Sequence, residues 1–377
     1  VLPPNVDPVS LAPGHAPDNE LQELQFSSNV FVTNPYWAAS KFAADDQRDR
    51  IIGSAQLTYD LTDWLSLQGR IGQDWYTSRT TSVTPYGTAF SPRGGMSEGE
   101  FRLTERNADL LLRATRDLTP SIGLDVFVGG NRMYRQGESL SLTGSDFNIP
   151  GLVTMSNLNS RSSSYGFWEK AINSIYGSVE LSYRDILFLS ATGRNDWSST
   201  LPDDNNSYFY PSISGSFIFS DVLSMPWWMT YGKLRASWAS VGSDTDPYRL
   251  ALTYGLLNFT HLGQPLGVIG QEAIPKFDLE PSKNEGAEAG IDLRFFDGRI
   301  GVDLTLYQET TKNEIVLSTV PFSSGFTAQV LNVASMRNRG IEMLLTTTPI
   351  STGNFAWGVD VNFSKNENKI LALAEGI

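Results

Sequence analysis

Two-residue alternation of apolar and polar side chains constrains this chain more than any other feature. Residues 300–307 read Ile-Gly-Val-Asp-Leu-Thr-Leu-Tyr, and residues 355–363 read Phe-Ala-Trp-Gly-Val-Asp-Val-Asn-Phe. Because successive side chains of a β-strand point to opposite faces, this pattern predicts strands with one apolar and one polar face. Helical periodicity is nearly absent. The sequence therefore predicts an all-β fold.

About twelve such strands follow one another along the chain, and they are longer than the roughly five or six residues of an average soluble strand. Asp-Gly at 297–298 marks a tight hairpin between two of them. The predicted strands cover 50–60, 64–79, 101–116, 121–136, 171–184, 186–199, 209–221, 229–243, 283–296, 299–314, 336–349 and 354–366.

The connections between these strands alternate strictly between short turns and longer loops. The longest predicted loops cover 80–100, 137–170, 244–282 and 315–335. In an antiparallel meander, this alternation places all short turns at one end and all long loops at the other. That asymmetry is typical of transmembrane β-barrels, which have short periplasmic turns, long extracellular loops and strands of at least about 9–11 residues.

Aromatic residues beside the short turns agree with this interpretation. Tyr59 and Trp64 flank one turn, and Trp227 and Trp228 lie at another. Such positions suit an aromatic girdle at the level of the lipid headgroups. Ordinary hairpin aromatics explain any single one of them equally well.

Composition excludes several other classes of protein. The 377 residues contain 28 Lys and Arg against 41 Asp and Glu, a net charge of −13, with no Cys and only two His. An acidic chain is a poor ligand for nucleic acid, and the absence of Cys excludes thiolate metal sites and disulfides. No apolar run is long enough for a transmembrane helix, and the first residues do not resemble a signal peptide.

No constellation of residues for catalysis or for a cofactor is apparent, so we expect neither an enzyme nor a bound cofactor. Acidic pairs occur at 203–204 and at Asp244 and Asp246. They could supply oxygen ligands to Ca²⁺, but solvated loops explain them more simply, and no metal site is predicted.

Ionisable residues on the polar side of the alternation predict a wide, wet interior, because a small dry barrel could not accommodate them unpaired. The predicted lumen-facing polar residues are Asp125, Glu180, Arg194, Asp196, Arg235, Glu288, Asp292, Arg294, Asp303, Glu342 and Asp360. Arg194 and Asp196 lie on one face and are close enough to pair, so a structural corner competes there with a contact to substrate or plug.

Several segments resemble the SusC/RagA class of TonB-dependent outer-membrane transporters, from about residue 34 onward. Order and spacing both fit. The matching segments include Asn34-Pro-Tyr-Trp37, Arg194-Asn-Asp-Trp-Ser-Ser-Thr-Leu-Pro202, Tyr210-Pro-Ser-Ile-Ser-Gly-Ser-Phe217, Lys233-Leu-Arg-Ala-Ser-Trp238 and Asn338-Arg-Gly-Ile-Glu342.

The resemblance implies a 22-stranded barrel in the bacterial outer membrane, filled by an N-terminal plug. It also implies a SusD-like lipoprotein lid, energy supplied by TonB with ExbB/ExbD, and import of glycan oligosaccharides or peptides. We expect residues 1–48 to be an extracellular loop segment and residues 49–377 to be part of the barrel, with the plug and the remaining strands outside this chain. Residues 42–46 are predicted to form a short helical turn.

The long loops are the predicted place for recognition, because exposed aromatic rings can stack on sugars, bury peptide side chains or dock a lid. Packing of a loop against itself is an equally good explanation for any one ring. The candidates for contact with substrate or lid are Tyr86, Phe147, Tyr165, Phe167, Trp168, Trp197, Tyr248 and Phe259.

One alternative stays open from the sequence: a smaller, self-closed outer-membrane pore or adhesin without energy coupling. A gene that continues upstream into a plug and downstream into further strands would favour the transporter.

Overall fold

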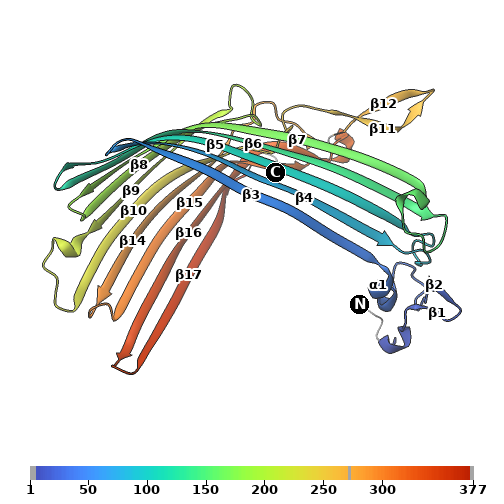
Figure 1. The fold of residues 1–377 in the computed structure, drawn as a ribbon, viewed down its shortest axis with the longest axis horizontal. Coiled ribbons are helices and arrows are strands. Elements are labelled where there is room, and N and C mark those ends of the chain that lie inside the picture. The colour runs from blue at the N-terminus through green and yellow to red at the C-terminus, as the bar shows by residue number, and fades with distance from the viewer. Residues whose placement is uncertain (1–5, 271–272, 374–377) are drawn as a thin grey trace. The chain divides into compact units, whose positions relative to one another are not determined.

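The computed structural model describes residues 6–270 and 273–373, and strands dominate these residues (Figure 1). The one α-helix is α1 (Pro35–Lys41), and none of the described helices has the length and apolar character to cross a membrane. The twelve long strands are β3 (Ala43–Thr62), β4 (Leu65–Thr84), β5 (Gly95–Thr119), β6 (Ile122–Phe147), β7 (Leu158–Tyr183), β8 (Leu187–Ser198), β9 (Ser207–Ile218), β10 (Met229–Ser243), β14 (Ser282–Phe295), β15 (Ile300–Thr319), β16 (Ala328–Ser351) and β17 (Ala356–Ala372).

The long strands form one sheet in which each strand lies beside its neighbours in sequence. The order runs from β3 to β10 and then through β14, β15 and β16 to β17. The neighbouring long strands from β7 to β17 pair in antiparallel fashion, as expected for a meander. Within the described residues β3 and β17 are the two edges, so the sheet is not closed. The prediction of an all-β, membrane-barrel type of sheet is confirmed.

Short elements fill the remaining segments. A hairpin of β1 (His15–Ala16) and β2 (Asn19–Glu23) precedes α1, a second hairpin of β11 (Tyr254–His261) and β12 (Gln264–Ile269) follows β10, and β13 (Ala273–Ile274) pairs in parallel with β16. The 3₁₀ helices are η1 (Pro8–Leu11), η2 (Met155–Asn157), η3 (Phe219–Asp221) and η4 (Phe322–Ser324).

The strands are longer than predicted on the long-loop side. The predicted loops at 80–100 and 137–170 were wrong over most of their length, because β4 to β7 continue into them and leave only 85–94 and 148–157 outside the strands. These extensions are rich in Ser, Thr, Glu and Arg on both faces. Above a hydrocarbon layer neither face needs apolar residues, so the alternation that reveals a strand fades.

The segment before the sheet also differs from the prediction. Helix α1 begins where Asn34 accepts a hydrogen bond from Tyr36 N and Pro35 occupies the first turn, which are ordinary helix-start signals. It ends at Lys41, and β3 begins at Ala43. The predicted helical turn at 42–46 was therefore wrong, and the sheet starts before residue 49.

The chain divides into two compact units, which are described separately. The first comprises Val1–Ser54, Gly72–Arg106 and Tyr134–Glu169. Its apolar cluster contains Val83, Met96, Phe147 and Leu158. Trp37 is buried as well and donates its indole N–H to Thr88 Oγ1 at 3.0 Å.

The second unit comprises Ala55–Ile71, Asn107–Met133 and Lys170–Ile377. Leu201, Leu279 and Val330 form its buried cluster, and all three lie toward the long-loop ends of the strands. Along the strands themselves the apolar side chains are exposed. The sheet is therefore not built around a core of the kind that soluble domains have.

Candidate functional site: the two faces of the sheet

The register of the second unit assigns side chains to two faces. Residues directly opposite each other in an antiparallel pair share a face. One row across five strands joins Glu180 to Ser190, Ser190 to Ser214, Ser214 to Ser237, and Ser237 to Glu288. We call the face that carries this row the polar face, and the opposite side the apolar face.

Ten of the eleven polar residues singled out from the sequence lie on this polar face, because register and two-residue spacing connect all ten to the row above. They are Glu180, Arg194, Asp196, Arg235, Glu288, Asp292, Arg294, Asp303, Glu342 and Asp360. Asp125, on β6, lines a cavity of about 260 Å³ together with Glu180. Asp125 accepts hydrogen bonds from Arg113 and Thr115.

The apolar face leaves large hydrophobic side chains uncovered. Leu189, Ile213, Leu234 and Leu306 are between 47% and 57% exposed. Leu189 and Ile213 lie on neighbouring strands, and Phe363 on β17 continues the same face. Soluble monomers rarely expose a contiguous apolar surface of this extent, whereas a lipid-facing sheet requires one.

Arg235 crosses the polar face from β10 to β15. Its guanidinium reaches Asp303 through two hydrogen bonds, Nη1 to Oδ2 at 2.9 Å and Nη2 to Oδ1 at 2.5 Å, and also bonds Thr305 Oγ1. The side chain passes over Gly290 on the strand between, where a Cβ atom would lie 2.6 Å from Arg235 Nε. Gly290 thus permits an ion pair that joins three strands.

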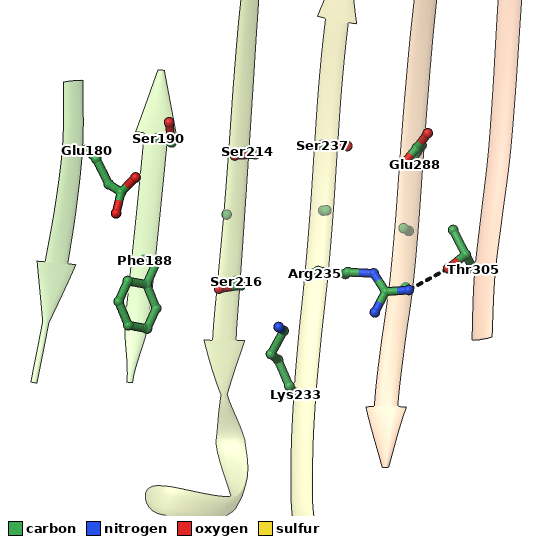
Figure 2. Close-up of a pocket in the computed structure, with 14 residues that line it drawn as sticks. Glu180, Phe188, Ser190, Ser214, Ser216, Lys233, Arg235, Ser237, Glu288 and Thr305 are labelled. Carbon is green, nitrogen blue, oxygen red and sulfur yellow. Dashed lines mark hydrogen bonds between the residues drawn. The ribbon is translucent and has the colours of Figure 1, made fainter. Parts of the chain in front are cut away.

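A cavity of about 360 Å³ lies beside this ion pair. Small residues such as Ser214, Ser216 and Ser237 form its floor, and Figure 2 shows the guanidinium of Arg235 and the Glu288 carboxylate at one side, with Glu180 at the other. Such a floor of hydroxyls bounded by charges suits a wet, polar contact rather than burial of an apolar ligand.

Arg194 and Asp196 form an ion pair, as expected if the motif around them is a structural corner. Arg194 Nε lies 2.7 Å from Asp196 Oδ1, and its Nη2 donates to Ser174 Oγ at 2.7 Å. The Tyr210 hydroxyl donates to the other carboxylate oxygen, and Asp196 is 5% exposed. The motif forms a network that joins β7, β8 and β9.

Asp244 has a role that sequence reasoning missed. It follows β10, and its carboxylate accepts hydrogen bonds from Lys170 Nζ at 2.6 Å, from Thr200 Oγ1 at 3.3 Å and from Ser198 Oγ. These contacts tie the start of the connection after β10 to the middle of β7 and to the end of β8. The carboxylate considered for Ca²⁺ is therefore used by an ion pair, and no sequence signal joins residues so far apart in the chain.

The aromatic candidates divide into three groups. Five are exposed: Tyr165, Phe167, Trp197, Tyr248 and Phe259. Trp168 is half-buried, with the Arg135 guanidinium 5.7 Å from its ring centre.

Tyr86 and Phe147 belong to a third group, because both pack in the apolar cluster of the first unit. Phe147 is only 2% exposed and so presents no surface to a ligand; its selection as a contact residue was wrong. Tyr165, Phe167 and Trp168 lie within β7 rather than in a loop.

A sheet of long antiparallel strands, apolar on one exposed face and polar on the other, defines a β-barrel protein of the membrane type. The chain matches the family model described as TonB dependent receptor-like, beta-barrel, over residues 5–372. This chain belongs to that family.

Two TonB-dependent receptors are similar to this chain in sequence. TonB-dependent receptor P26 of Formosa agariphila is 36% identical over 210 residues, which is 54% of this chain and 21% of that protein. TonB-dependent receptor SusC of Bacteroides thetaiotaomicron is 26% identical over 212 residues, again 54% of this chain and 21% of that protein.

The structure of the RagAB peptide transporter superposes with a TM-score of 0.81 at 21% identity, covering 92% of this chain and 39% of that one. The fold is thus of the SusC and RagA type. The chain spans about a fifth to two fifths of the length of the proteins it matches.

Proposed function

We propose that this chain forms part of the barrel wall of an outer-membrane importer of oligomeric nutrients, either glycan oligosaccharides or peptides. The observation that carries the proposal is the separation of the two faces over the sheet from β7 to β17, in a chain that belongs to the TonB-dependent receptor family. In this proposal the apolar face contacts lipid and the polar face lines the lumen.

The orientation follows from the connections. Short turns such as the one at 296–299 would face the periplasm, and longer connections such as 244–281 would face the outside, where they meet substrate. The exposed rings of Tyr248 and Phe259 are the best placed candidates for that contact, because they lie in the connection beyond the long-loop end of β10.

The proposed partners are a SusD-like surface lipoprotein, which would close over the long loops, and TonB with ExbB/ExbD, which would act through a region outside this chain. Membership of the TonB-dependent receptor family supports the energy source, and the similarity to SusC and RagA supports the lid. A solved relative described as a peptide transporter makes peptides the first substrate class to test.

The test is an uptake assay in strains that lack the gene encoding this chain. Growth on mixed peptides and on mixed glycan oligosaccharides as sole nutrient should fail for one substrate class, while growth on the corresponding monomers continues. Complementation should restore growth only when TonB is present. Uptake that persists without TonB would instead support a passive pore, and unimpaired growth on every oligomer would overturn the transport role.

The lid is tested separately by affinity purification from outer membranes in mild detergent. The expected result is a stoichiometric lipoprotein that stays bound through a second purification step. A barrel that purifies alone under several detergents, yet still supports uptake, would remove the lid from the proposal.

A further inference from the structure

A group of basic side chains gathers at the long-loop end of the apolar face on β14 to β17. We call it the basic belt; it consists of Lys283, Lys312, Arg337, Arg339, Lys365 and Lys369. Register places all six on this face: Lys283 lies opposite Lys312, Arg337 opposite Lys369, and Lys365 opposite Ile341. Arg339 lies two residues from Ile341 on the same strand.

The belt begins where the apolar residues end. On β17 the face reads Val359, Val361 and Phe363 and then turns to Lys365. On β16 it reads Leu345, Met343 and Ile341 and then Arg339. This boundary runs across neighbouring strands, so that cations stand directly above a surface suited to acyl chains. Long Lys and Arg side chains commonly reach from such positions to the headgroup level.

Two carboxylates form ion pairs with three of the six basic residues. Glu285 lies 2.9 Å from Lys283 and 2.7 Å from Lys312. Glu367 pairs with Arg339 at 2.8 Å. Six cations against two carboxylates leave an excess of four positive charges, in a chain whose net charge is −13.

Arg337 and Lys369 form the centre of the belt, where the Glu367 carboxylate that pairs with Arg339 also attracts Arg337. They are direct cross-strand neighbours, and neither side chain makes a hydrogen bond or a salt bridge with another described residue. Like charges directly opposite each other are unfavourable in a sheet. An anion that bridges the two would remove this repulsion and gain charge-assisted hydrogen bonds.

The same level of the apolar face carries no charge on β7 to β10. The register row of Arg339 crosses these strands at Val179, Ala191, Ile213 and Trp238, and the row of Lys365 crosses them at Leu181, Leu189, Gly215 and Ala236. A general need for solubility above the membrane would not distinguish β14 to β17 from β7 to β10, so the excess of cations on β14 to β17 calls for a specific ligand.

We propose that the basic belt binds the phosphate groups of an anionic glycolipid in the leaflet on the long-loop side, with the acyl chains of that lipid on the apolar residues below. This inference rests on the proposed function, because it requires the apolar face to contact lipid. Neighbouring strands are about 4.8 Å apart, so the belt is about 14 Å wide across four strands and can hold more than one phosphate. Each cation near an anionic membrane surface contributes about fivefold to binding.

The experiment measures lipid retained by the full-length protein, purified from outer membranes, delipidated in mild detergent and incubated with diphosphoryl lipid A. The double variant R337Q/K369Q removes two cations that form no ion pair with described residues, so the sheet should fold normally. Native mass spectrometry should show about thirtyfold weaker binding than for the unaltered protein. The matched control R249Q/K276Q removes two loop cations and should bind like the unaltered protein.

Two further ligands, dephosphorylated lipid A and inorganic phosphate, test whether binding depends on the phosphate groups and on the lipid that carries them. The unaltered protein should bind the dephosphorylated lipid as weakly as R337Q/K369Q binds the diphosphoryl form, and inorganic phosphate at equal concentration should not compete. Equal binding of diphosphoryl lipid A by R337Q/K369Q and the unaltered protein overturns the inference but leaves the proposed function standing. Effective competition by inorganic phosphate identifies a small-anion site instead and also overturns it. Failure of the proposed function is recognised independently, by the uptake assay or by absence of the protein from the outer-membrane fraction.

Discussion

Ile213 on β9 offers the sharpest test of which face meets lipid. It lies near the middle of its strand, six residues from Ser207, and its side chain is 57% exposed. Ala191 and Trp238 are its direct cross-strand neighbours, and the diagonal positions on β8 and β10 are also uncharged. A lysine introduced here would therefore find no carboxylate with which to pair.

The expected cost of Ile213→Lys follows from this position. A lysine on the lipid face near the bilayer midplane destabilises a barrel by about 2–4 kcal/mol. Ser214→Lys is the matched variant one residue further along. Its side chain would enter the 360 Å³ cavity on the polar face, with Glu180 and Glu288 among the lining residues. In a wet lumen the cost should be below about 1 kcal/mol.

The assay is urea unfolding of the full-length protein in phosphatidylcholine vesicles, followed by tryptophan fluorescence and by the heat-dependent mobility of the folded barrel on gels. Ile213→Lys should lower the free energy of unfolding by at least about 2 kcal/mol more than Ser214→Lys does. Equal losses, or a larger loss for Ser214→Lys, would refute the assignment of the two faces. If Ile213→Lys does not insert into vesicles at all while Ser214→Lys does, the gel will show folded barrel only for Ser214→Lys. That result also means that Ile213→Lys is the more destabilising variant.

Three further predictions concern contacts that hold strands and loops together. Asp244→Asn should raise hydrogen exchange at the start of its loop about thirtyfold or more, because a largely buried ion pair is lost. Asp246→Asn, which changes an exposed carboxylate, should raise it less than about fivefold. Gly290→Val should lower the free energy of unfolding by about 1–3 kcal/mol by displacing the arginine that crosses it, while Gly286→Val, which meets open space, should be nearly neutral. Trp37→Phe should lower the stability of the first unit to proteolysis by about 1–3 kcal/mol, since it leaves a buried hydroxyl without its indole donor; resistance equal to that of the unaltered protein would contradict this.

The strands and their faces could be predicted because alternation is a local property. A side chain's face depends only on its place in its own strand, so Glu180, Asp292 and Asp360 could each be assigned without knowing what lies beside them. The strand ends could not be located, because the residues toward the long-loop ends of the strands alternate less clearly. Gly95 and Leu158, for example, begin strands inside segments that composition alone describes as loops.

The contacts between strands depend on register, which the sequence does not state. The pair of Arg235 and Asp303 spans 68 positions, and the bond from Lys170 to Asp244 spans 74. Packing of the long connections is equally non-local, which is why Phe147 lies in a core and Phe259 does not. The basic belt did leave a signal: the alternation after Phe363 continues as Lys, Glu and Lys at positions 365, 367 and 369.

The two ends of the apolar face differ in chemistry, and this difference gives the sheet a direction relative to a membrane. At the short-turn end Trp228 stacks on Phe295 at 5.8 Å, and Trp227 lies 5.9 Å from Phe296. Aromatic rings suit either headgroup region, but an excess of cations over carboxylates suits a surface rich in anions. Under the proposal that the basic belt binds an anionic glycolipid, the charges of the apolar face and the loop lengths both assign the long-loop end of the sheet to the outer side of the membrane.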